Sequence, residues 1–369
     1  MTAQPTILLL GAGHAHLGVI DDWLKDGPPD ARTVLVEPRE AMHYSGMVPG
    51  WLGGEYRRDE ATIALAPLVE AAGIEWHRSE AVALDPEGKT ATLATGEVLR
   101  FDLCSIATGG VGRAAALLGE DPRLLDIRPI DRFMDRWTEL REAEEPPRRI
   151  AVVGGGAGGI ELAFGLRNAG HAPEVTLIAG REGVLPDHSK SAARKVRREC
   201  LGQAIALRPT DARIEDGALH AGDEELDRPD LIVAAIGSGA PDWPRASGLP
   251  VDEDGFVRVG ATQQVEGLPD FFAAGDVARR TDRPLSHSGV HAVYAGPVLS
   301  KNLRRRLADR GDLATYDPRA MDFYLLNTCR GTSILSWGPV ALKGRWLRRL
   351  KDWLDRRWID RFSSPGDPR

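Results

Sequence analysis

Two glycine-rich segments are the places where this 369-residue chain could bind phosphate: Gly11–His16 and Gly154–Gly159. Each follows a short apolar run with β-type spacing and precedes a run with helical spacing, so each is expected to open a helix. The free backbone N–H groups at the start of such a helix, together with the helix dipole, favour the pyrophosphate of a dinucleotide. The residues therefore predict nucleotide binding at two places in one chain.

The second segment matches the GxGxxG pattern in full, at Gly154, Gly156 and Gly159. In that pattern the first glycine makes a tight turn, the second leaves room for phosphate, and the third lets helix and strand pack closely. The first segment has Gly11 and Gly13, but His16 stands at the third position. One such pattern means little alone, whereas two in register, each within a strand–turn–helix–strand unit, indicate two dinucleotide-binding units.

The residue that ends the second strand of each unit commonly contacts the adenosine ribose. In the first unit this residue is Glu37, whose carboxylate could bind the ribose hydroxyls, and Pro38 follows it. In the second unit the position is Ala179, and Arg181 follows two residues later. An arginine there could bind the 2′-phosphate of NADP, or it could be an ordinary surface charge.

Each unit also closes with a similar strand, Phe101–Gly110 in the first and Pro229–Gly237 in the second. A charged, alternating stretch with a tight turn precedes each closing strand and is typical of a β-meander. The expected fold is α/β: two Rossmann-like domains, each with a β-meander insertion, and a small C-terminal region that ends in an amphipathic helix. The expected domains are 1–112 with 260–310 for FAD, 113–259 for NAD(P), and 311–369 for the C-terminal region.

Composition excludes several classes of protein. The hydrophobic fraction is 42% and the charged fraction 27%, as in a globular chain, and the net charge of −7 argues against a nucleic-acid partner. The N-terminus has no basic leader and no run is long enough to span a membrane, which predicts a cytoplasmic protein. Cys104, Cys200 and Cys329 form no close pair, which excludes a disulfide scaffold and a four-cysteine zinc site.

A third segment, Gly267–Val277, reads as an apolar strand that ends on Gly275 and Asp276, and a small-residue helix is expected over Ser288–Leu303. With this segment the chain resembles the two-dinucleotide-binding flavoproteins called pyridine nucleotide-disulfide oxidoreductase-like. The resemblance implies FAD on the first unit and NAD(P)H on the second. It also implies that Asp276 holds the ribityl chain of FAD and that the following helix points its N-terminus at the flavin.

Three branches of this superfamily can be compared with the chain. Disulfide reductases carry a redox-active cysteine pair where this chain has 43–50, which contains no cysteine, so dithiol chemistry is not expected. Sulfide:quinone reductases use a cysteine in the region of 108–153, where none occurs, although Cys329 could match their C-terminal cysteine. Type II NADH dehydrogenases, which reduce quinone at a membrane surface, usually have two glutamines where this chain has Val290 and Tyr294.

The chain most resembles the NADH-dehydrogenase-like flavoprotein found fused to selenide, water dikinase. The segments that carry this resemblance are Gly11–His16, Tyr44–Gly50, Gly289–Leu299 and Lys351–Arg357. In that group a lysine is expected where this chain has His287, so a lysine–flavin contact does not carry over.

The motifs and the resemblance together imply a set of cofactor-binding residues, with the loop 45–49 bordering the flavin ring. For FAD they are Gly11, Gly13, His14, Ala15, His16, Glu37, Pro38, Ser45, Met47, Val82, Ala107, Thr108, Gly109, Gly275, Asp276, Ser288 and Gly289. For the pyridine nucleotide they are Gly154, Gly156, Gly159, Glu161, Arg181 and Gly237.

Histidines near these motifs could suggest other chemistry. His14 with His16, and His287 with His291, have no acidic or cysteine partner at ligand spacing, so no metal is expected. His287 is the one candidate catalytic residue, because it precedes the flavin-facing helix and could share a proton with the reduced ring.

The segment Ala341–Phe362 carries eight basic and three acidic residues. Its apolar residues lie three and four apart, which predicts a basic amphipathic helix with two alternative roles. It could lie on an anionic membrane or a partner, which would place the protein peripherally on the inner face of the membrane, or it could pack on the flavin domain and cover the site. The apolar residues are Trp346, Leu347, Leu350, Trp353, Leu354 and Trp358.

The expected function is that of an FAD-dependent oxidoreductase, which takes a hydride from NAD(P)H to flavin and passes electrons to a second acceptor, a small molecule or a quinone, without a redox disulfide. Two alternatives stay open. One is a membrane-surface quinone reductase of the type II NADH dehydrogenase or sulfide:quinone reductase type. The other is a regulatory or partner protein that binds FAD without turnover.

Overall fold

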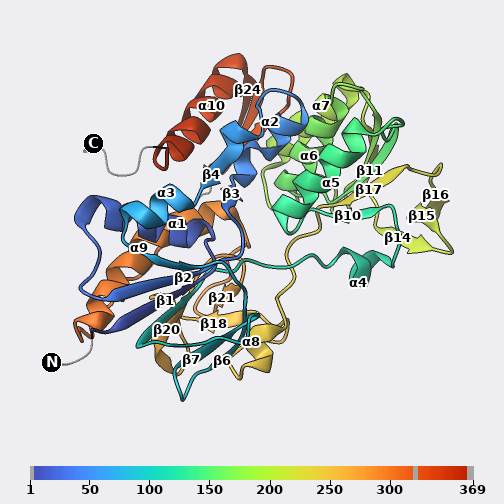
Figure 1. Cartoon of the computed structure of the whole chain (residues 1–369). Coiled ribbons are helices and arrows are strands. Elements are labelled where there is room, and N and C mark those ends of the chain that lie inside the picture. The colour runs from blue at the N-terminus through green and yellow to red at the C-terminus, as the bar shows by residue number, and fades with distance from the viewer. Residues whose placement is uncertain (1–3, 319–322, 364–369) are drawn as a thin grey trace.

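The first unit is built on an eight-stranded sheet, ordered β21-β18-β19-β20-β9-β1-β2-β5 (Figure 1). The structure is a computed structural model that describes residues 4–318 and 323–363. β20, β9, β1, β2 and β5 run parallel, so their carboxyl ends gather at one edge, where nucleotides bind in sheets of this kind. The strands are β1 (Thr6–Leu10), β2 (Arg32–Val36), β5 (Glu75–His77), β9 (Leu103–Ile106), β18 (Val257–Val259), β19 (Gln264–Val265), β20 (Leu268–Ala273) and β21 (Ala278–Arg280).

Successive residues of β1 enter different cores because side chains alternate across a strand. Ile7 and Leu9 pack with helices α1 and α9, whereas Leu8 and Leu10 pack with the first meander on the other face. Figure 1 shows the sheet between these two layers. The elements are α1 (His14–Asp26), α9 (Gly289–Leu307), β6 (Ala81–Asp85), β7 (Thr90–Leu93) and β8 (Val98–Arg100).

Helices α1 and α9 cross closely because two glycines face each other at the crossing. A Cβ atom on Gly296 would lie 2.9 Å from the Cα of Gly18 and 2.7 Å from the carbonyl oxygen of Ala15. This contact holds the start of α9 beside the first glycine turn.

The second unit repeats the plan with a parallel five-stranded sheet, ordered β10-β17-β11-β12-β13. Its meander packs on one face of the sheet, as the alternating charged stretch predicted. The strands are β10 (Leu124–Asp126), β11 (Arg149–Val153), β12 (Glu174–Ile178), β13 (Ala206–Arg208), β17 (Leu231–Ala234) and, in the meander, β14 (Ala212–Glu215), β15 (Ala218–Ala221) and β16 (Glu224–Glu225). The helices are α4 (Ala114–Leu118), α5 (Ile130–Glu142), α6 (Ala157–Arg167) and α7 (Lys190–Gly202).

The boundary between the units differs from the expected residue 259. Leu249, Val257 and Val259 are buried in the core beneath the first meander, and β18 belongs to the first sheet. The short helix α8 (Trp243–Ala246) also lies against β6. The chain therefore returns to the first unit soon after β17.

Between β2 and β5 the chain forms a hairpin and short helices that reach the second unit. A Cβ atom on Gly165 of α6 would lie 2.5 Å from the carbonyl oxygen of Pro49 in α2, so these helices are in close contact. The region expected as a loop at 45–49 is therefore helical in part. Its elements are β3 (Ala41–His43), η1 (Ser45–Met47), α2 (Val48–Leu52), η2 (Asp59–Ala61), β4 (Thr62–Ala64) and α3 (Ala66–Ala71).

The C-terminal region is a three-stranded antiparallel sheet followed by the long helix α10, drawn in red in Figure 1. The sheet packs on α6 and α7, and α10 returns to the segment around α2. The expected amphipathic helix is confirmed in position. The elements are β22 (Phe323–Asn327), β23 (Ser333–Trp337), β24 (Val340–Gly344) and α10 (Arg345–Asp360).

Candidate active site

A cleft runs along the carboxyl ends of β1, β9 and β20 and holds about 840 Å³ of empty space. Many of the residues expected to bind FAD line it: Gly13, His14, Ala15, Ser45, Ala107, Thr108, Gly109, Gly275, Asp276 and Gly289.

Unsatisfied polar atoms in this cleft fit a polar ligand. Thr108 Oγ1 and Arg128 Nε are buried and have no hydrogen-bond partner among the described residues. Buried polar groups are normally hydrogen-bonded, so these atoms indicate a partner that enters the cleft. Gly109, next to Thr108, has φ +80° and open space where a Cβ atom would stand, which allows close approach. A hydroxyl, a guanidinium and a helix start are suited to the hydroxyls and pyrophosphate of FAD.

Glu37 ends β2 as predicted, and its carboxylate already has protein partners. The backbone N–H of Ala12 donates to Oε2 at 2.8 Å, and the Arg39 guanidinium donates to both carboxylate oxygens at 2.6 and 2.8 Å. Burial alone would raise the pKa of Glu37, but the bonds from Arg39 outweigh it and lower that pKa. Arg39 itself lines the cleft, whereas Pro38 is exposed. The pair thus fixes a charged group beside the first glycine turn.

Asp276 follows β20 at the cleft, as the motif predicted. Arg128 Nη2 lies 2.6 Å from Asp276 Oδ2, and the Ser238 hydroxyl donates to the same oxygen at 2.9 Å. Arg128 follows β10 and Ser238 follows β17, so both partners come from the second unit. Residues of the second unit therefore close one side of the first-unit cleft, an arrangement that no local sequence signal indicates.

Seven residues expected to contact FAD do not line the cleft: Glu37, Pro38, Ser288, Gly11, His16, Met47 and Val82. Gly11, with φ +81°, makes the turn itself, since a Cβ atom there would lie 2.7 Å from the carbonyl oxygen of Ala107. His16 is fully buried and bonds Gly11 O and Ser105 Oγ, so it joins α1 to β9 instead of contacting phosphate. Met47 is a buried core residue, and Val82 is 47% exposed on the meander.

His14 lines the cleft at the start of α1 and packs near Tyr44, with ring centroids 5.8 Å apart. Burial lowers the pKa of His14 to about 4, so the side chain is neutral at pH 7. A neutral imidazole can donate one hydrogen bond to a phosphate or ribityl oxygen without adding a charge.

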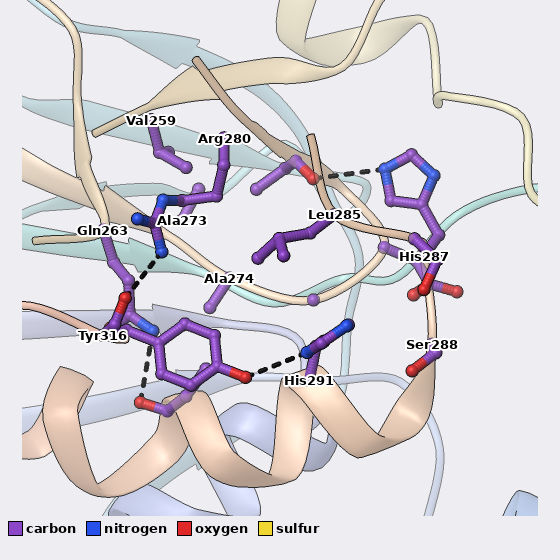
Figure 2. Close-up of a pocket in the computed structure, with 15 residues that line it drawn as sticks. Val259, Gln263, Ala273, Ala274, Arg280, Leu285, His287, Ser288, His291 and Tyr316 are labelled. Atoms are coloured by element: carbon purple, nitrogen blue, oxygen red, sulfur yellow. Dashed lines mark hydrogen bonds between the residues drawn. The ribbon is translucent and has the colours of Figure 1, made fainter. Parts of the chain in front are cut away.

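His287 is placed differently from the prediction. Figure 2 shows it at the edge of a second, smaller hollow beside the start of α9. Its Nε2 lies 3.2 Å from the carbonyl oxygen of Ala278, and its ring stacks on Phe256 with centroids 4.2 Å apart. Because it does not line the cleft, the proposed proton exchange with flavin is not supported. Ser288 lines the same hollow, and its buried hydroxyl has no partner among the described residues.

The second glycine turn has the geometry of the first. The Gly11 N–H donates to Val36 O at 2.9 Å, and the Gly154 N–H donates to Ile178 O at 2.8 Å. A Cβ atom on Gly159 would lie 2.2 Å from the carbonyl oxygen of Gly154, so α6 packs tightly on the turn. The region beside Gly156 is open, and Gly237 after β17 is open as well with φ +87°. The turn therefore leaves space for a pyrophosphate at the start of α6.

Glu161 lies on α6 but is partly buried and faces the C-terminal region, away from the open start of the helix. Its Oε1 accepts a hydrogen bond from the Asn327 backbone N–H at 2.7 Å. Burial raises the pKa of Glu161 to about 7, although the nearby Lys351 lowers it in part. The predicted contact with the nucleotide is thus replaced by a carboxyl group that can exchange a proton near neutral pH.

Lys351 completes this buried group and was missed by sequence reasoning. Its Nζ donates to Asp355 Oδ2 and to the carbonyl oxygen of Gly46, each at 3.0 Å. Burial lowers the pKa of Lys351, but the Asp355 and Glu161 carboxylates outweigh burial and raise that pKa. Tyr44 also interacts with Asp355, and burial raises the pKa of Tyr44. Lys351, Asp355, Glu161 and Tyr44, the buried acid–base group, lie against the loop that borders the cleft.

Helix α10 places its charged pair inward and two of its three tryptophans outward. Leu347, Lys351, Asp355 and Trp358 are buried, whereas Trp346 and Trp353 are 57% and 53% exposed. The helix therefore packs on the flavin side, as one of the two alternatives expected, and it also presents an exposed apolar face. Leu354 is also exposed on it, and the exposed basic residues are Arg345, Arg349, Arg356 and Arg357.

The remaining sequence signals are easily placed. Cys104, Cys200 and Cys329 are free and buried, and burial raises the pKa of each thiol. Within residues 4–318 and 323–363 no group of three or more potential metal ligands gathers. None of the helices in this part of the chain is both long and apolar enough to cross a bilayer.

Comparison with known proteins agrees with this architecture. Residues 5–305 match the family described as pyridine nucleotide-disulphide oxidoreductase. The chain is 25% identical to ferroptosis suppressor protein 1 of Taeniopygia guttata over 79% of each chain. It is also 25% identical to demethylphylloquinone reductase NdbB of Synechocystis, covering 76% of this chain and 73% of the relative. The NDH2 of Plasmodium falciparum in complex with NADH has a similar fold, with a TM-score of 0.79, 13% identity and 99% of both chains covered.

The family match covers most of the chain, and both nucleotide turns and the FAD cleft fall within it. The chain thus belongs to the pyridine nucleotide-disulphide oxidoreductase family, as an oxidoreductase that binds FAD and takes a hydride from NAD(P)H.

Proposed function

We propose that this oxidoreductase passes the reducing equivalents of NAD(P)H to a quinone at a membrane surface. One observation carries the proposal. Helix α10 has Lys351 and Asp355 against the loop at the FAD cleft, and on its opposite face it exposes Trp346 and Trp353. A single helix thus connects an apolar surface, suited to lipid, with a buried acid–base group beside the cofactor. A lipid-soluble acceptor that takes up protons needs both features.

The cofactor residues follow from the cleft. The start of α1 and the Arg128 guanidinium would hold the FAD pyrophosphate, and Thr108 Oγ1 with Asp276 would bind the ribityl hydroxyls. The start of α6 would hold the pyridine nucleotide. When bound, FAD supplies hydride acceptance from the coenzyme and electron transfer to the second substrate.

The acid–base group would supply the proton that a quinone takes up with its electrons. Glu161, with its pKa near 7, can hold a proton at neutral pH and release it to an acceptor oxygen. The Lys351 ammonium, held by Asp355, places a fixed positive charge beside this carboxyl and favours its charged form after the proton leaves. Helices α2 and α6 belong to the first and the second unit and contact each other, so this group lies where the two units meet.

The outer face of α10 supports a peripheral location on the inner face of a membrane. Tryptophans at the depth of lipid headgroups and arginines facing anionic lipids are the features of interfacial helices. The helix is tied to the protein by ion pairs at its inner edge, among them Arg348 with Glu55 at 3.0 Å and Arg356 with Glu60 at 3.0 Å. These pairs connect α10 to the segment that contains Glu55 and Glu60.

Three further observations concern the choice between the possible electron acceptors. A demethylphylloquinone reductase is among the relatives, which favours quinone. A sulfide:quinone reductase mechanism would need a reactive thiol, and the only C-terminal candidate, Cys329, is buried with a raised pKa and donates to Pro49 O at 3.3 Å. The departure at Tyr294, which is 49% exposed on α9, leaves a phenol where type II enzymes usually have glutamine.

The experiment is an anaerobic two-step reduction of the purified flavoprotein. Flavin absorbance should bleach with NAD(P)H and return when a short-chain ubiquinone or menaquinone analogue is added, with or without anionic vesicles. A protein that stays yellow with both coenzymes would indicate the non-turnover alternative. A reduced flavin that no quinone reoxidises would contradict the proposed acceptor.

A further inference from the structure

We infer that the hollow beside the start of α9 is an effector site for a small uncharged ligand that carries both a hydrogen-bond donor and a hydrogen-bond acceptor, such as a small amide. The site lies behind one wall of the FAD cleft and is independent of the quinone proposal. Figure 2 shows Gln263, Arg280 and Ser288, whose polar atoms carry the inference, around this hollow.

The hollow and the FAD cleft share one wall. Ala274, Gly275 and Asp276, which follow β20, line both spaces. At the start of α9, Ser288 lines the hollow and the next residue, Gly289, lines the cleft. The hollow holds about 460 Å³ of empty space against about 840 Å³ for the cleft, so it suits a ligand smaller than a dinucleotide. A ligand there would contact the helix start that borders the cofactor.

Gln263 presents an unused acceptor in the hollow. Gln263 is 2% exposed, and its Nε2 donates to the carbonyl oxygen of Ala295 in α9 at 3.2 Å. This bond fixes the orientation of the side-chain amide, because the reverse orientation would place Oε1 against a carbonyl oxygen. Oε1 is buried and has no hydrogen-bond partner among the described residues. Since buried amide oxygens are normally bonded, this atom indicates a ligand with an N–H or O–H group.

Two side chains of the lining can donate hydrogen bonds to the same ligand. The buried Ser288 hydroxyl has no partner within the described part of the chain, and it does not cap α9 although Ser288 stands at the cap position. Arg280 is 9% exposed; its Nε and Nη2 donate to the Asp282 carboxylate, each at 2.7 Å, and its Nη1 donates to Tyr316 O at 2.9 Å. These bonds use three of the five guanidinium N–H groups and leave two for an acceptor.

The fixed charges at the hollow are paired with one another, which favours an uncharged ligand. Arg280 Nη2 lies 2.7 Å from Asp282, and Arg128 Nη2 lies 2.6 Å from Asp276. Burial lowers the pKa of His287, so this ring is mostly uncharged at pH 7. An ionic ligand would have to compete with an existing ion pair, whereas an amide needs only the donors and the acceptor already present.

The test compares two probes of nearly equal shape on the full-length, FAD-loaded protein. N-methylacetamide has an N–H donor and a carbonyl acceptor, whereas methyl acetate has the acceptor alone. In ligand-observed NMR titrations the amide should bind at least about tenfold more tightly than the ester, because the ester leaves Gln263 Oε1 unpaired. The amide should also shift the flavin absorbance, since the hollow and the cleft share a wall.

Two variants remove one polar partner each. Gln263→Met should abolish the preference for the amide over the ester, and Ser288→Ala should weaken the amide about fivefold. Gln264→Met is the matched control: this neighbouring glutamine donates to Pro269 O at 2.9 Å, does not line the hollow, and should bind both probes as the wild type does. If Gln263→Met does not fold, Ser288→Ala and the pair of probes still decide the question.

The outcomes that would overturn the inference are specific. Equal binding of the amide and the ester would overturn the site, as would a preference that persists in Gln263→Met. A crystal structure of the FAD-loaded protein at high amide concentration should show the amide N–H at Gln263 Oε1, and ordered water alone in the hollow would contradict the proposal. Selective binding without any change in flavin absorbance would refute the effector role.

Discussion

Replacement of Glu161 by glutamine tests the buried acid–base group directly. The pKa of Glu161 is raised from 4.5 to about 7 by burial. A group with that pKa is about nine-tenths protonated at pH 6 and about one-tenth protonated at pH 8. If Glu161 gives its proton to the quinone, turnover should fall about tenfold between these pH values. Glu161→Gln, which has no proton to give, should turn over slowly at both values and show no inflection near pH 7.

The raised pKa of Glu161 also makes the free energy of unfolding fall as the pH rises. The unfolded chain releases this proton near pH 4.5 and the folded chain near pH 7, so the stabilisation is complete below pH 4.5 and is lost as the pH rises through 7. The whole shift corresponds to about 3.4 kcal/mol, of which about 2.5 kcal/mol falls between pH 5 and pH 8. The free energy of unfolding of the wild type should therefore drop by about 2.5 kcal/mol more than that of Glu161→Gln over this range.

Both quantities are accessible with the FAD-loaded protein. Steady-state quinone reduction at saturating NAD(P)H gives the pH profile, and urea unfolding at pH 5 and pH 8 gives the stability difference. Flavin reduction by NAD(P)H alone should keep its rate in Glu161→Gln, because that step takes no proton from the protein. Glu70→Gln removes the same charge from an exposed site and should match the wild type. An inflection near pH 7 that persists in Glu161→Gln, or an unchanged pH dependence of its stability, would refute the reasoning.

Three further outcomes follow from the structure. Lys351→Met leaves Asp355 buried without its partner and should destabilise the protein by about 3–5 kcal/mol in urea unfolding, whereas Lys351→Met combined with Asp355→Leu should recover most of the loss. Exchange of Trp346 and Trp353 for serine should abolish cosedimentation with anionic vesicles at an unchanged rate of flavin reduction; retained cosedimentation would place the membrane contact elsewhere. Gly159→Ala puts a Cβ atom 2.2 Å from a carbonyl oxygen of the turn, so it should lose NAD(P)H reduction and keep the flavin spectrum, and normal reduction would contradict the packing described.

The features that could be predicted from the sequence are those that local chemistry dictates. Each glycine turn connects the end of a strand to the start of a helix. Its backbone conformation and close contacts require glycine, because a Cβ atom would clash. The spacing of the glycines alone predicts both turns. The two meanders follow from alternating charge, and the helix at 345–360 follows from its apolar period. The positions of Glu37 after β2 and of Asp276 after β20 also follow from local sequence, because each ends a strand motif.

The features that escaped prediction depend on contacts between distant parts of the chain. Lys351 meets Gly46 across some three hundred residues, and a lysine on a basic amphipathic helix gives no sign that it points inward. Glu161 follows a nucleotide motif, and only the packing of α6 on the C-terminal sheet turns it away from the nucleotide. Similarly, His287 precedes the flavin-facing helix, but stacking on Phe256 directs its ring into another hollow. In each case the sequence predicts the helix, or the segment before a helix, in which the residue lies. Contacts with distant residues then decide the direction of its side chain.

The proposed electron transfer runs from NAD(P)H through the FAD site to a quinone. Double-mixing stopped flow without oxygen tests it most directly: the flavoprotein is first reduced with NADPH and then mixed with a quinone analogue in anionic vesicles. We expect complete bleaching in the first step and recovery of the oxidised flavin spectrum in the second, at a rate that falls as the pH rises through 7. A flavin that stays reduced in the presence of quinone would contradict it.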